Sequence, residues 1–240
     1  MLKVENLSVI IEDKLVLKNI DLEIPSGETH ILFGPNGSGK TSLIMAILGY
    51  PQYKVKEGRI LFEGTDITAA SIEERAKLGI GMAYQNAPVI KGLSLQKLVD
   101  IIKKPSVDLT PFIEKLRMQN LLHRDINLGF SGGEKKRSEL LQLLAQNPNF
   151  LFLDEPESGV DIENMDIMGK VLGDFLERHQ VKKRKKSGLV ITHTGYILDY
   201  VNADKGYILI DGEMICSGNP YQMFEMIKVK GFKECASCHM

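Results

Sequence analysis

The amino-acid sequence predicts an α/β protein in which a central, mostly parallel sheet carries an inserted helical lobe. Two short apolar runs, at 31–33 and 150–153, are typical of strands that are buried on both faces of a sheet. A glycine-rich loop follows the first run, and leucines recur at helical spacing between residues 86 and 146. With 240 residues, the chain is long enough for one large domain or two lobes with a self-sufficient core.

The N-terminal part of the sequence consists of predicted strands separated by turns. The spacing Ser71-x-x-Glu74 is that of a capping box, which predicts the start of a helix, and a strand at 80–84 follows it. Before this helix, alternating and β-branched residues predict strands at 2–5, 9–11, 15–17, 19–24 and 57–64.

Residues 86–146 differ in character, because strand-like runs vanish there. We expect a single domain over residues 1–240, with a core formed by 1–85 and 147–240 and a helical subdomain at 86–146. Apolar periodicity predicts helices at 95–102, 111–118 and 135–145. Beyond them the sequence predicts strands at 150–153 and 189–192, a helix at 162–178, and a hairpin of 207–210 with 214–216 around the turn Asp211-Gly212.

The charge balance and the cysteine content exclude several classes of protein. Lys and Arg total 30 against 31 Asp and Glu, so no overall positive field attracts a nucleic acid. Three cysteines cannot form a disulfide framework, and they fit a reducing compartment. No apolar run approaches the roughly 18 residues of a membrane span, and no apolar stretch of signal-peptide length follows Lys3. We expect a cytoplasmic protein that binds no nucleic acid and does not insert into a membrane.

The phosphate-binding pattern G-x-x-x-x-G-K-[ST] is matched by Gly34-Pro35-Asn36-Gly37-Ser38-Gly39-Lys40-Thr41. An apolar strand precedes the loop, and a helix that continues from Ser42 follows it. The glycines allow successive backbone N–H groups to surround phosphate oxygens at a helix N-terminus. We expect Lys40 to contact the β- and γ-phosphates of a nucleotide and the Thr41 hydroxyl to ligate Mg²⁺.

Polar side chains follow three of the predicted strands. Asp154 and Glu155 come after 150–153, Gln85 follows 80–84, and His193 follows 189–192. Because ligands of open parallel sheets bind at the carboxyl ends of the strands, we expect these side chains beside the phosphates. Asp154 can hold Mg²⁺, and Glu155 can polarise a water for attack on the γ-phosphate. Gln85 can ligate Mg²⁺ or position that water, and His193 can contact the γ-phosphate.

The segment Ser131-Gly132-Gly133-Glu134 predicts a second anion site. Ser131-x-x-Glu134 is itself a capping box at the start of the helix 135–145. The two glycines after the cap leave backbone N–H groups uncovered at the helix N-terminus, where anions bind. Since residues 34–41 already hold one set of phosphates in each chain, we expect this second site to serve the nucleotide of another chain.

Taken together, these motifs resemble those of an ATP-binding-cassette (ABC) ATPase along essentially the whole chain. The resemblance implies a P-loop NTPase core of ABC ATPase type, with an antiparallel β subdomain and an inserted α-helical subdomain. It also implies a Mg-dependent ATPase that forms a head-to-tail dimer, with ATP held between the Walker A motif of one chain and the signature of the other. The family's Walker A, Q-loop, signature, Walker B, D-loop and switch histidine correspond to 34–41, Gln85, 131–134, 150–155, 158–161 and His193.

The extended signature at 129–137 is similar to that of the SufC subfamily, the ATPases of iron–sulfur cluster assembly. Gly159 and the run Thr192-His193 followed by 197–200 are similar as well. The resemblance implies a soluble scaffold of SufB/SufD type as partner. Two alternatives stay open: the nucleotide-binding subunit of a membrane ABC transporter, and a non-catalytic clamp gated by ATP.

Three further features carry expectations. Ile11 lies where many cassette ATPases place an aromatic ring against adenine, which predicts weak selectivity for ATP over GTP. The basic run 182–186 predicts a solvated loop, with docking to an acidic partner as the alternative. The C-x-x-C-H motif of haem attachment is matched by Cys235-Ala236-Ser237-Cys238-His239. Because we expect no export, we assign this motif either no role or a transient contact with iron or a cluster.

Overall fold

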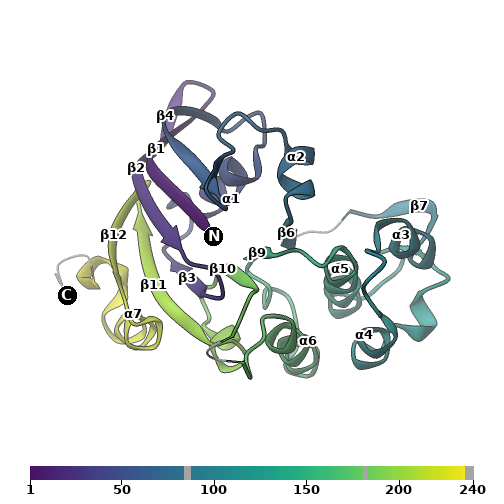
Figure 1. Ribbon diagram of the computed structural model, residues 1–240. Helices are drawn as coiled ribbons and strands as arrows, with labels where there is room; N and C mark the ends of the chain where they lie inside the picture. The colour runs from purple at the N-terminus through teal and green to yellow at the C-terminus, as the bar shows by residue number, and fades with distance from the viewer. Residues whose placement is uncertain (84–87, 181–182, 236–240) are drawn as a thin grey trace.

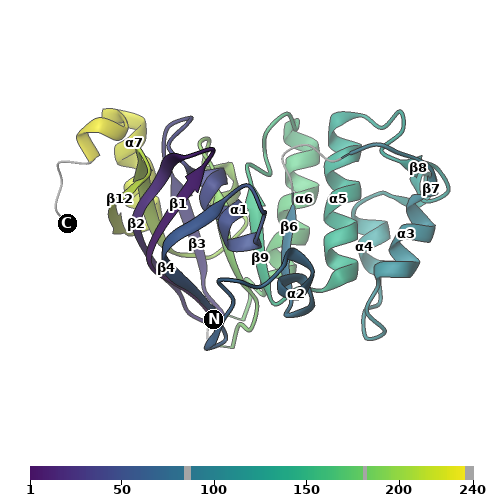
Figure 2. The same ribbon diagram turned by 90° about the horizontal axis from the view of Figure 1, so that it is seen from above.

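The computed structural model describes residues 1–83, 88–180 and 183–235, with side chains up to residue 232. It confirms the α/β fold: an antiparallel sheet packs over a larger central sheet, and a helical lobe extends to one side (Figure 1). Helix α1 (Lys40–Leu48) packs in the core that the two sheets share. Seen from above, the helical lobe lies to one side of both sheets (Figure 2).

The N-terminal sheet is continuous where the sequence predicted shorter strands. Asn6 and Asn19 take positive φ values of 48° and 47°, and the β1–β2 register shifts around them. Asparagine tolerates this conformation better than most residues, so the strands bulge there instead of ending. The order is β2-β1-β4-β5, with bounds Leu2–Ile11 (β1), Lys14–Ile24 (β2), Lys54–Phe62 (β4) and Thr65–Asp66 (β5).

The central sheet places alternate side chains in two cores. In β9, Phe150 and Phe152 face the core shared with the N-terminal sheet, whereas Leu151 and Leu153 face the core shared with the helices. All four are at most 1% exposed, as the unbroken apolar run predicted. The order is β12-β11-β3-β10-β9-β6, with bounds Thr29–Phe33 (β3), Ile80–Ala83 (β6), Phe150–Asp154 (β9), Ser187–Ile191 (β10), Ala203–Ile210 (β11) and Glu213–Gly218 (β12).

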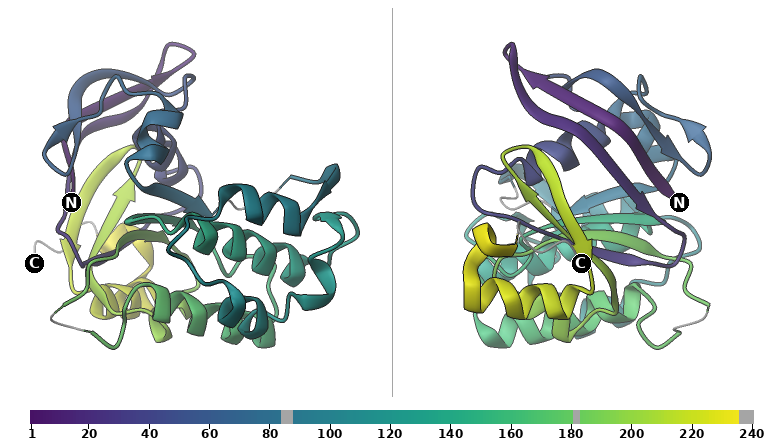
Figure 3. Two further views of the ribbon diagram at one scale, coloured as in Figure 1. Left: turned by 45° about the vertical axis from the view of Figure 1, so that its right-hand side comes forward. Right: turned by 90° about the vertical axis from the view of Figure 1, so that its left-hand side faces the viewer.

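Helices cover both faces of the central sheet. α1 (Lys40–Leu48) fills the space between the sheets, and α2 (Ile72–Lys77) begins at the predicted capping box, in which both hydrogen bonds form. On the other face α7 packs beside the β11–β12 hairpin (Figure 3). The helices that cover this face are α5 (Gly132–Gln146), α6 (Ile162–Phe175) and α7 (Pro220–Cys235).

The helical lobe contains a short β-ribbon. The expectation that strands vanish between 86 and 146 is wrong, because β7 (Ile90–Ser94) pairs with β8 (Asp125–Ile126). Strands this short have too few alternating positions to be detected in the sequence. The helices follow the prediction more closely, since α3 is Leu95–Ile102 and α4 is Thr110–Lys115. The described residues also form 3-10 turns at Gln119–Leu121 and Tyr196–Asp199.

His30, in β3, is expected to make the free energy of unfolding depend on pH. It is 1% exposed, and burial lowers its pKa below the ordinary 6.5, although the hydrogen bond to Glu28 (2.7 Å) and the charge of Asp204 oppose this shift. The unfolded chain therefore takes up a proton first as pH falls. Stability is fully present above the unfolded-state pKa and declines below it, by at most about 1.4 kcal/mol per pH unit.

Urea denaturation of the wild type and of His30→Gln at pH 7.5 and 5.5 measures this contribution. We expect the variant to lose less stability between the two pH values than the wild type loses. Equal losses would show that His30 does not contribute to the pH dependence. Comparing the two differences separates titration from any general destabilisation by the substitution.

Candidate functional site

The loop 34–39 joins the end of β3 to α1 at the carboxyl edge of the central sheet. Lys40 is 6% exposed, and its Nζ donates hydrogen bonds to the carbonyl oxygens of Gly34 (2.8 Å) and Pro35 (3.0 Å). Burial lowers the pKa of Lys40, and the carboxylates of Glu155 and Asp154 oppose that shift. The loop thus holds a cation at a helix N-terminus, an arrangement suited to a multiply charged anion.

Two glycines of this loop are required by close contacts. A Cβ at Gly34 would lie 2.3 Å from the carbonyl oxygen of Leu209, and one at Gly39 would lie 2.9 Å from Leu17 Cδ2. Gly39 also has φ +106°, which L side chains rarely adopt. The shape of the loop therefore depends on the glycines that the phosphate-binding pattern specifies.

Thr41 lies beside Asp154, although 113 positions separate them in sequence: Thr41 Oγ1 donates a hydrogen bond to Asp154 Oδ2 at 3.0 Å. Asp154 ends β9 and is 5% exposed. Burial raises the pKa of its carboxyl, and the hydrogen bond from Thr41 opposes this. Both side chains offer oxygen ligands of the kind that Mg²⁺ takes. Within the described residues, no cluster of three His, Cys, Asp or Glu side chains could hold a metal ion.

Glu155 and His193 meet at the same edge of the sheet. Glu155 Oε1 lies 3.3 Å from His193 Nδ1. The backbone of Glu155 has φ 49°, and its N–H donates to the carbonyl oxygen of Ile191 at the end of β10 (3.1 Å). This turn brings the Walker B carboxylate to the strand that precedes the histidine. Gln85 lies outside the described residues, so its predicted role at this edge stays a prediction.

A cavity of about 640 Å³ opens over the P-loop. Lys14, Leu15 and Val16 at the start of β2 line it next to the turn Asp211-Gly212, and Glu155 lines it as well. The carbonyl oxygen of Gly212 accepts a hydrogen bond from the Lys18 N–H (2.8 Å), which joins this turn to β2. Ile11 is not among its lining residues, so the contact of Ile11 with a base stays a prediction. The other lining residues are Lys18, Asn36, Gly37, Gly39, Lys40, Thr41 and Ser42.

ATP and GTP are expected to bind with dissociation constants within about tenfold of each other, because among the described residues no aromatic side chain lines this cavity. A stacked ring would add roughly 1–3 kcal/mol per base. Without it, binding depends mainly on the phosphates, which both nucleotides share. Calorimetric titration with ATP, GTP and tripolyphosphate measures the contribution of the base. A preference for ATP of about a hundredfold or more would mean that another group recognises adenine.

Ser131 caps α5 as predicted. Its Oγ accepts from the Glu134 N–H (3.2 Å), and Glu134 Oε2 accepts from the Ser131 N–H (2.7 Å). Gly133 has no room for a side chain, because a Cβ there would lie 2.5 Å from the carboxamide of Asn164. Ser131 and Gly132 are exposed, and neither they nor Gly133 lines the cavity over the P-loop of the same chain.

Sequence reasoning did not single out Glu157. It is 6% exposed, and its Oε1 accepts hydrogen bonds from Thr192 and from Thr194 (2.9 Å). Thr192 Oγ1 in turn accepts from the Gly195 N–H (2.9 Å). One buried carboxylate thus fixes the loop after β9 to the segment that carries His193. The position of this acidic residue, between Asp154-Glu155 and the segment 158–161, was the signal by which the sequence could have pointed to it.

The basic run is less solvated than the sequence suggested. Arg184 forms an ion pair with Asp204 (2.6 Å), and Lys186 Nζ donates to the side-chain oxygen of Asn147 (2.6 Å) at the end of α5. Burial, with a smaller effect from Lys104, lowers the pKa of Lys186 to about 8. Two of the predicted loop cations therefore bind to the protein's own structure. Lys182 and the motif residues 236–239 lie outside the described residues, as does the side chain of Cys235.

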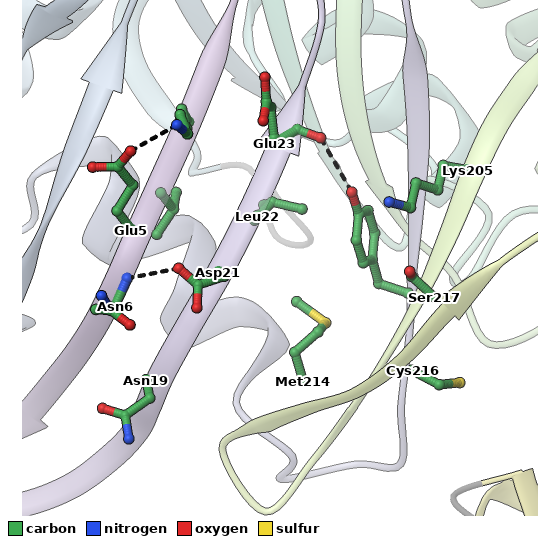
Figure 4. Close-up of a pocket in the computed structure, with 13 residues that line it drawn as sticks. Glu5, Asn6, Asn19, Asp21, Leu22, Glu23, Lys205, Met214, Cys216 and Ser217 are labelled. Atoms are coloured by element: carbon green, nitrogen blue, oxygen red, sulfur yellow. Dashed lines mark hydrogen bonds and ion pairs between the residues drawn. The ribbon is translucent and has the colours of Figure 1, made fainter. Parts of the chain in front are cut away.

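A second cavity, of about 600 Å³, lies between the β1–β2 and β11–β12 hairpins (Figure 4). Glu5, Asn6 and Asp21 project from one side, and Lys205 and Ser217 from the other. The Tyr207 hydroxyl donates to the backbone carbonyl oxygen of Glu23 (3.1 Å) across it. None of the P-loop residues lines this cavity.

The family model described as ABC transporter matches residues 17–158. The chain is 38% identical to the probable ATP-dependent transporter ycf16 of Cyanidium caldarium, covering 97% of this chain and 95% of that protein. It is 35% identical to the probable ATP-dependent transporter SufC of Escherichia coli, covering 97% of each. A probable ABC transporter ATP-binding protein of Streptococcus pyogenes is 34% identical, over 91% of this chain and 89% of that protein.

Solved structures show the same fold. A nucleotide-free ATP-binding cassette of an ABC transporter superposes with a TM-score of 0.79 at 23% identity, covering 100% of this chain and 99% of that chain. A dimeric ATP-binding cassette bound to ADP and phosphate gives a TM-score of 0.74 at 23% identity, covering 91% and 98%.

Fold and comparisons agree, and the chain belongs to the ABC transporter family. Within that family it is a SufC-like ABC ATPase, because the likeness to SufC runs along nearly its whole length. No helix among the described residues combines the length and the apolar character that crossing a bilayer requires.

Proposed function

We propose that this protein binds and hydrolyses ATP in the cavity over the P-loop. One observation carries the proposal: Lys40, Thr41, Asp154 and Glu155 converge at one edge of the sheet, with Thr41 Oγ1 3.0 Å from Asp154 Oδ2. Phosphoryl transfer needs a cation on the phosphates, oxygen ligands for a metal ion, and a group that takes a proton from water. These four residues supply them.

The side chains have distinct roles in this proposal. Triphosphate oxygens accept the hydrogen bonds that Lys40 otherwise gives to its own loop. Glu155 takes a proton from a water whose oxygen attacks the γ-phosphorus, and the bond to the bridging oxygen breaks so that ADP leaves with the electron pair. His193, whose Nδ1 is 3.3 Å from Glu155 Oε1, orients that carboxylate and, in this proposal, contacts the γ-phosphate.

Thr41 and Asp154 would hold the Mg²⁺ ion, with Gln85 as a further ligand. Their oxygen atoms suit a hard cation, and the hydrogen bond between them places both oxygens next to each other. When bound, the ion neutralises charge on the phosphate oxygens.

The second half of each ATP site comes from another copy of the chain. The tip of α5 lies outside the cavity of its own chain, and there Ser131, which caps the helix, and Gly132 are exposed, whereas Gly133 is buried. In a head-to-tail dimer, Ser131, Gly132 and Gly133 of each copy meet the nucleotide of the other. Both contacts use the same two surfaces, so the assembly closes as a dimer.

The energy of this cycle is used, in our proposal, for iron–sulfur cluster assembly on a cytoplasmic scaffold of SufB/SufD type. The likeness to SufC over 97% of the chain supports it. A second candidate is the nucleotide-binding subunit of a membrane transporter, because the relatives are named transporters or transporter ATP-binding proteins.

Affinity purification of the tagged chain from its own host, in the presence of ATP, separates the two candidates. We expect a soluble scaffold that acquires an iron–sulfur cluster, detected by its visible absorbance, and acquires it more slowly when Glu155 is replaced by glutamine. Recovery of an integral membrane protein in a stable complex would favour the transporter instead.

A further inference from the structure

We propose that a cavity at the C-terminal end of α1 binds an acidic segment of a partner protein. This cavity of about 590 Å³ is lined by the C-terminal end of α1, β4 and the loop before α2. These elements lie close together in the ribbon (Figures 1 and 2), and the P-loop is at the other end of α1. Its charged lining residues are Lys54, Lys56 and Arg75. No Asp or Glu among the described residues lines it, so all of its charge has one sign.

Arg75 is the buried one of the three cationic residues that line the cavity. It is 2% exposed, and its guanidinium donates to the carbonyl oxygens of Ala70 (2.9 Å), Ala46 (2.9 Å), Ile47 (2.6 Å) and Thr68 (2.8 Å). All four acceptors are neutral. No carboxylate in the described part of the chain neutralises this cation, so its charge contributes to the potential inside the cavity.

Lys54 and Lys56 are the two exposed cationic residues of the cavity. They stand two residues apart on β4, so their side chains leave the strand on the same side. Within the part of the chain that the structure describes, neither forms an ion pair. Two acids of α2 have other partners: Glu73 pairs with Lys77 (2.7 Å), and Glu74 closes the capping box. Glu57, which follows Lys56 on β4, does not line the cavity. The positive charge of the cavity is therefore available to a partner.

The contacts favour a polypeptide over a small anion as occupant. Four N–H groups of Arg75 already bind backbone carbonyls, and tight anion sites need several converging donors. The rest of the lining includes Tyr50, Tyr53, Pro51 and Val55, which offer apolar and aromatic contact area. Cations beside tyrosines suit a segment that alternates carboxylates with apolar side chains.

Titration of the full-length ¹⁵N-labelled chain with a synthetic peptide of alternating glutamate and alanine tests the proposal. We expect amide shifts at residues 49–56 and 68–71, and saturable binding of the fluorescein-labelled peptide at low salt. The double variant Lys54→Glu, Lys56→Glu should weaken binding by about tenfold or more, because two attractive charges become repulsive. Circular dichroism confirms that these exposed substitutions leave the fold intact.

The matched control reverses two exposed lysines on another surface, Lys103→Glu with Lys185→Glu, and should bind the peptide as the wild type does. Equal weakening in both double variants would reduce the effect to overall charge and overturn the proposal. So would equally tight binding of a peptide with glutamine in place of glutamate. Displacement of the peptide by inorganic phosphate at equal charge concentration would overturn the choice of a polypeptide. ATPase activity does not enter these readouts, so the inference can fail while the proposed function stands.

Discussion

Replacing Glu155 with glutamine is expected to slow ATP hydrolysis by about 10²–10⁴-fold while ATP binding persists. Glutamine keeps the size of the side chain but cannot accept the proton of the attacking water. The loss corresponds to about 3–5 kcal/mol of activation free energy. Phosphate release under saturating ATP measures the rate, and calorimetric titration of the same preparations measures the dissociation constant.

Two further variants test whether the loss of hydrolysis is specific to the carboxylate of Glu155. Glu225→Gln changes a carboxylate to an amide on the exposed side of α7 and should keep wild-type turnover. Lys40→Ala should weaken ATP binding itself, because the triphosphate loses its buried cation. Unchanged turnover in Glu155→Gln would remove Glu155 from catalysis. Turnover absent even in the wild type with its partner present would support the clamp that ATP closes without chemistry.

The parts of the site that the sequence predicted are those fixed by local structure. The P-loop, both capping boxes and the polar residues after β9 and β10 depend on a few neighbouring positions and on the direction of parallel strands. Thr41 and Asp154 therefore meet as expected, at 3.0 Å, although they are distant in sequence. The second anion site at 131–134 and the family's order of motifs both indicate a head-to-tail dimer, which stays a proposal for this chain.

The parts that were missed depend on contacts between segments. Glu157 is important because two loops meet and bury its carboxylate against Thr192 and Thr194, and no periodic pattern records this. The sequence placed Glu155 and His193 at the same edge of the sheet, but their direct contact at 3.3 Å also depends on how the two loops meet. α7 was also missed, and its helical pattern is interrupted at Gly231, where φ is 74°. In β7 and β8 the signal is too short to separate from a loop.

Replacing Ser131 with arginine is expected to abolish ATP hydrolysis while each isolated chain still binds ATP. Arginine at the exposed tip of α5 would fill the space in which the partner's phosphates approach the uncovered N–H groups. The binding cavity of the same chain does not include Ser131, so its affinity should change little. Steady-state phosphate release and ATP titration at a protein concentration too low for dimers measure the two quantities.

Ser71→Arg is the matched control, because Ser71 caps α2 through the same pair of hydrogen bonds with Glu74. Each substitution loses a cap worth about 1 kcal/mol, but only Ser131 faces a nucleotide in the proposed dimer. Mixing Ser131→Arg with Lys40→Ala should restore part of the activity. The mixed dimer contains one site in which both the P-loop and the signature are wild type. Full hydrolysis by Ser131→Arg alone, or two variants that form mixed dimers and stay inactive, would contradict a site shared between copies.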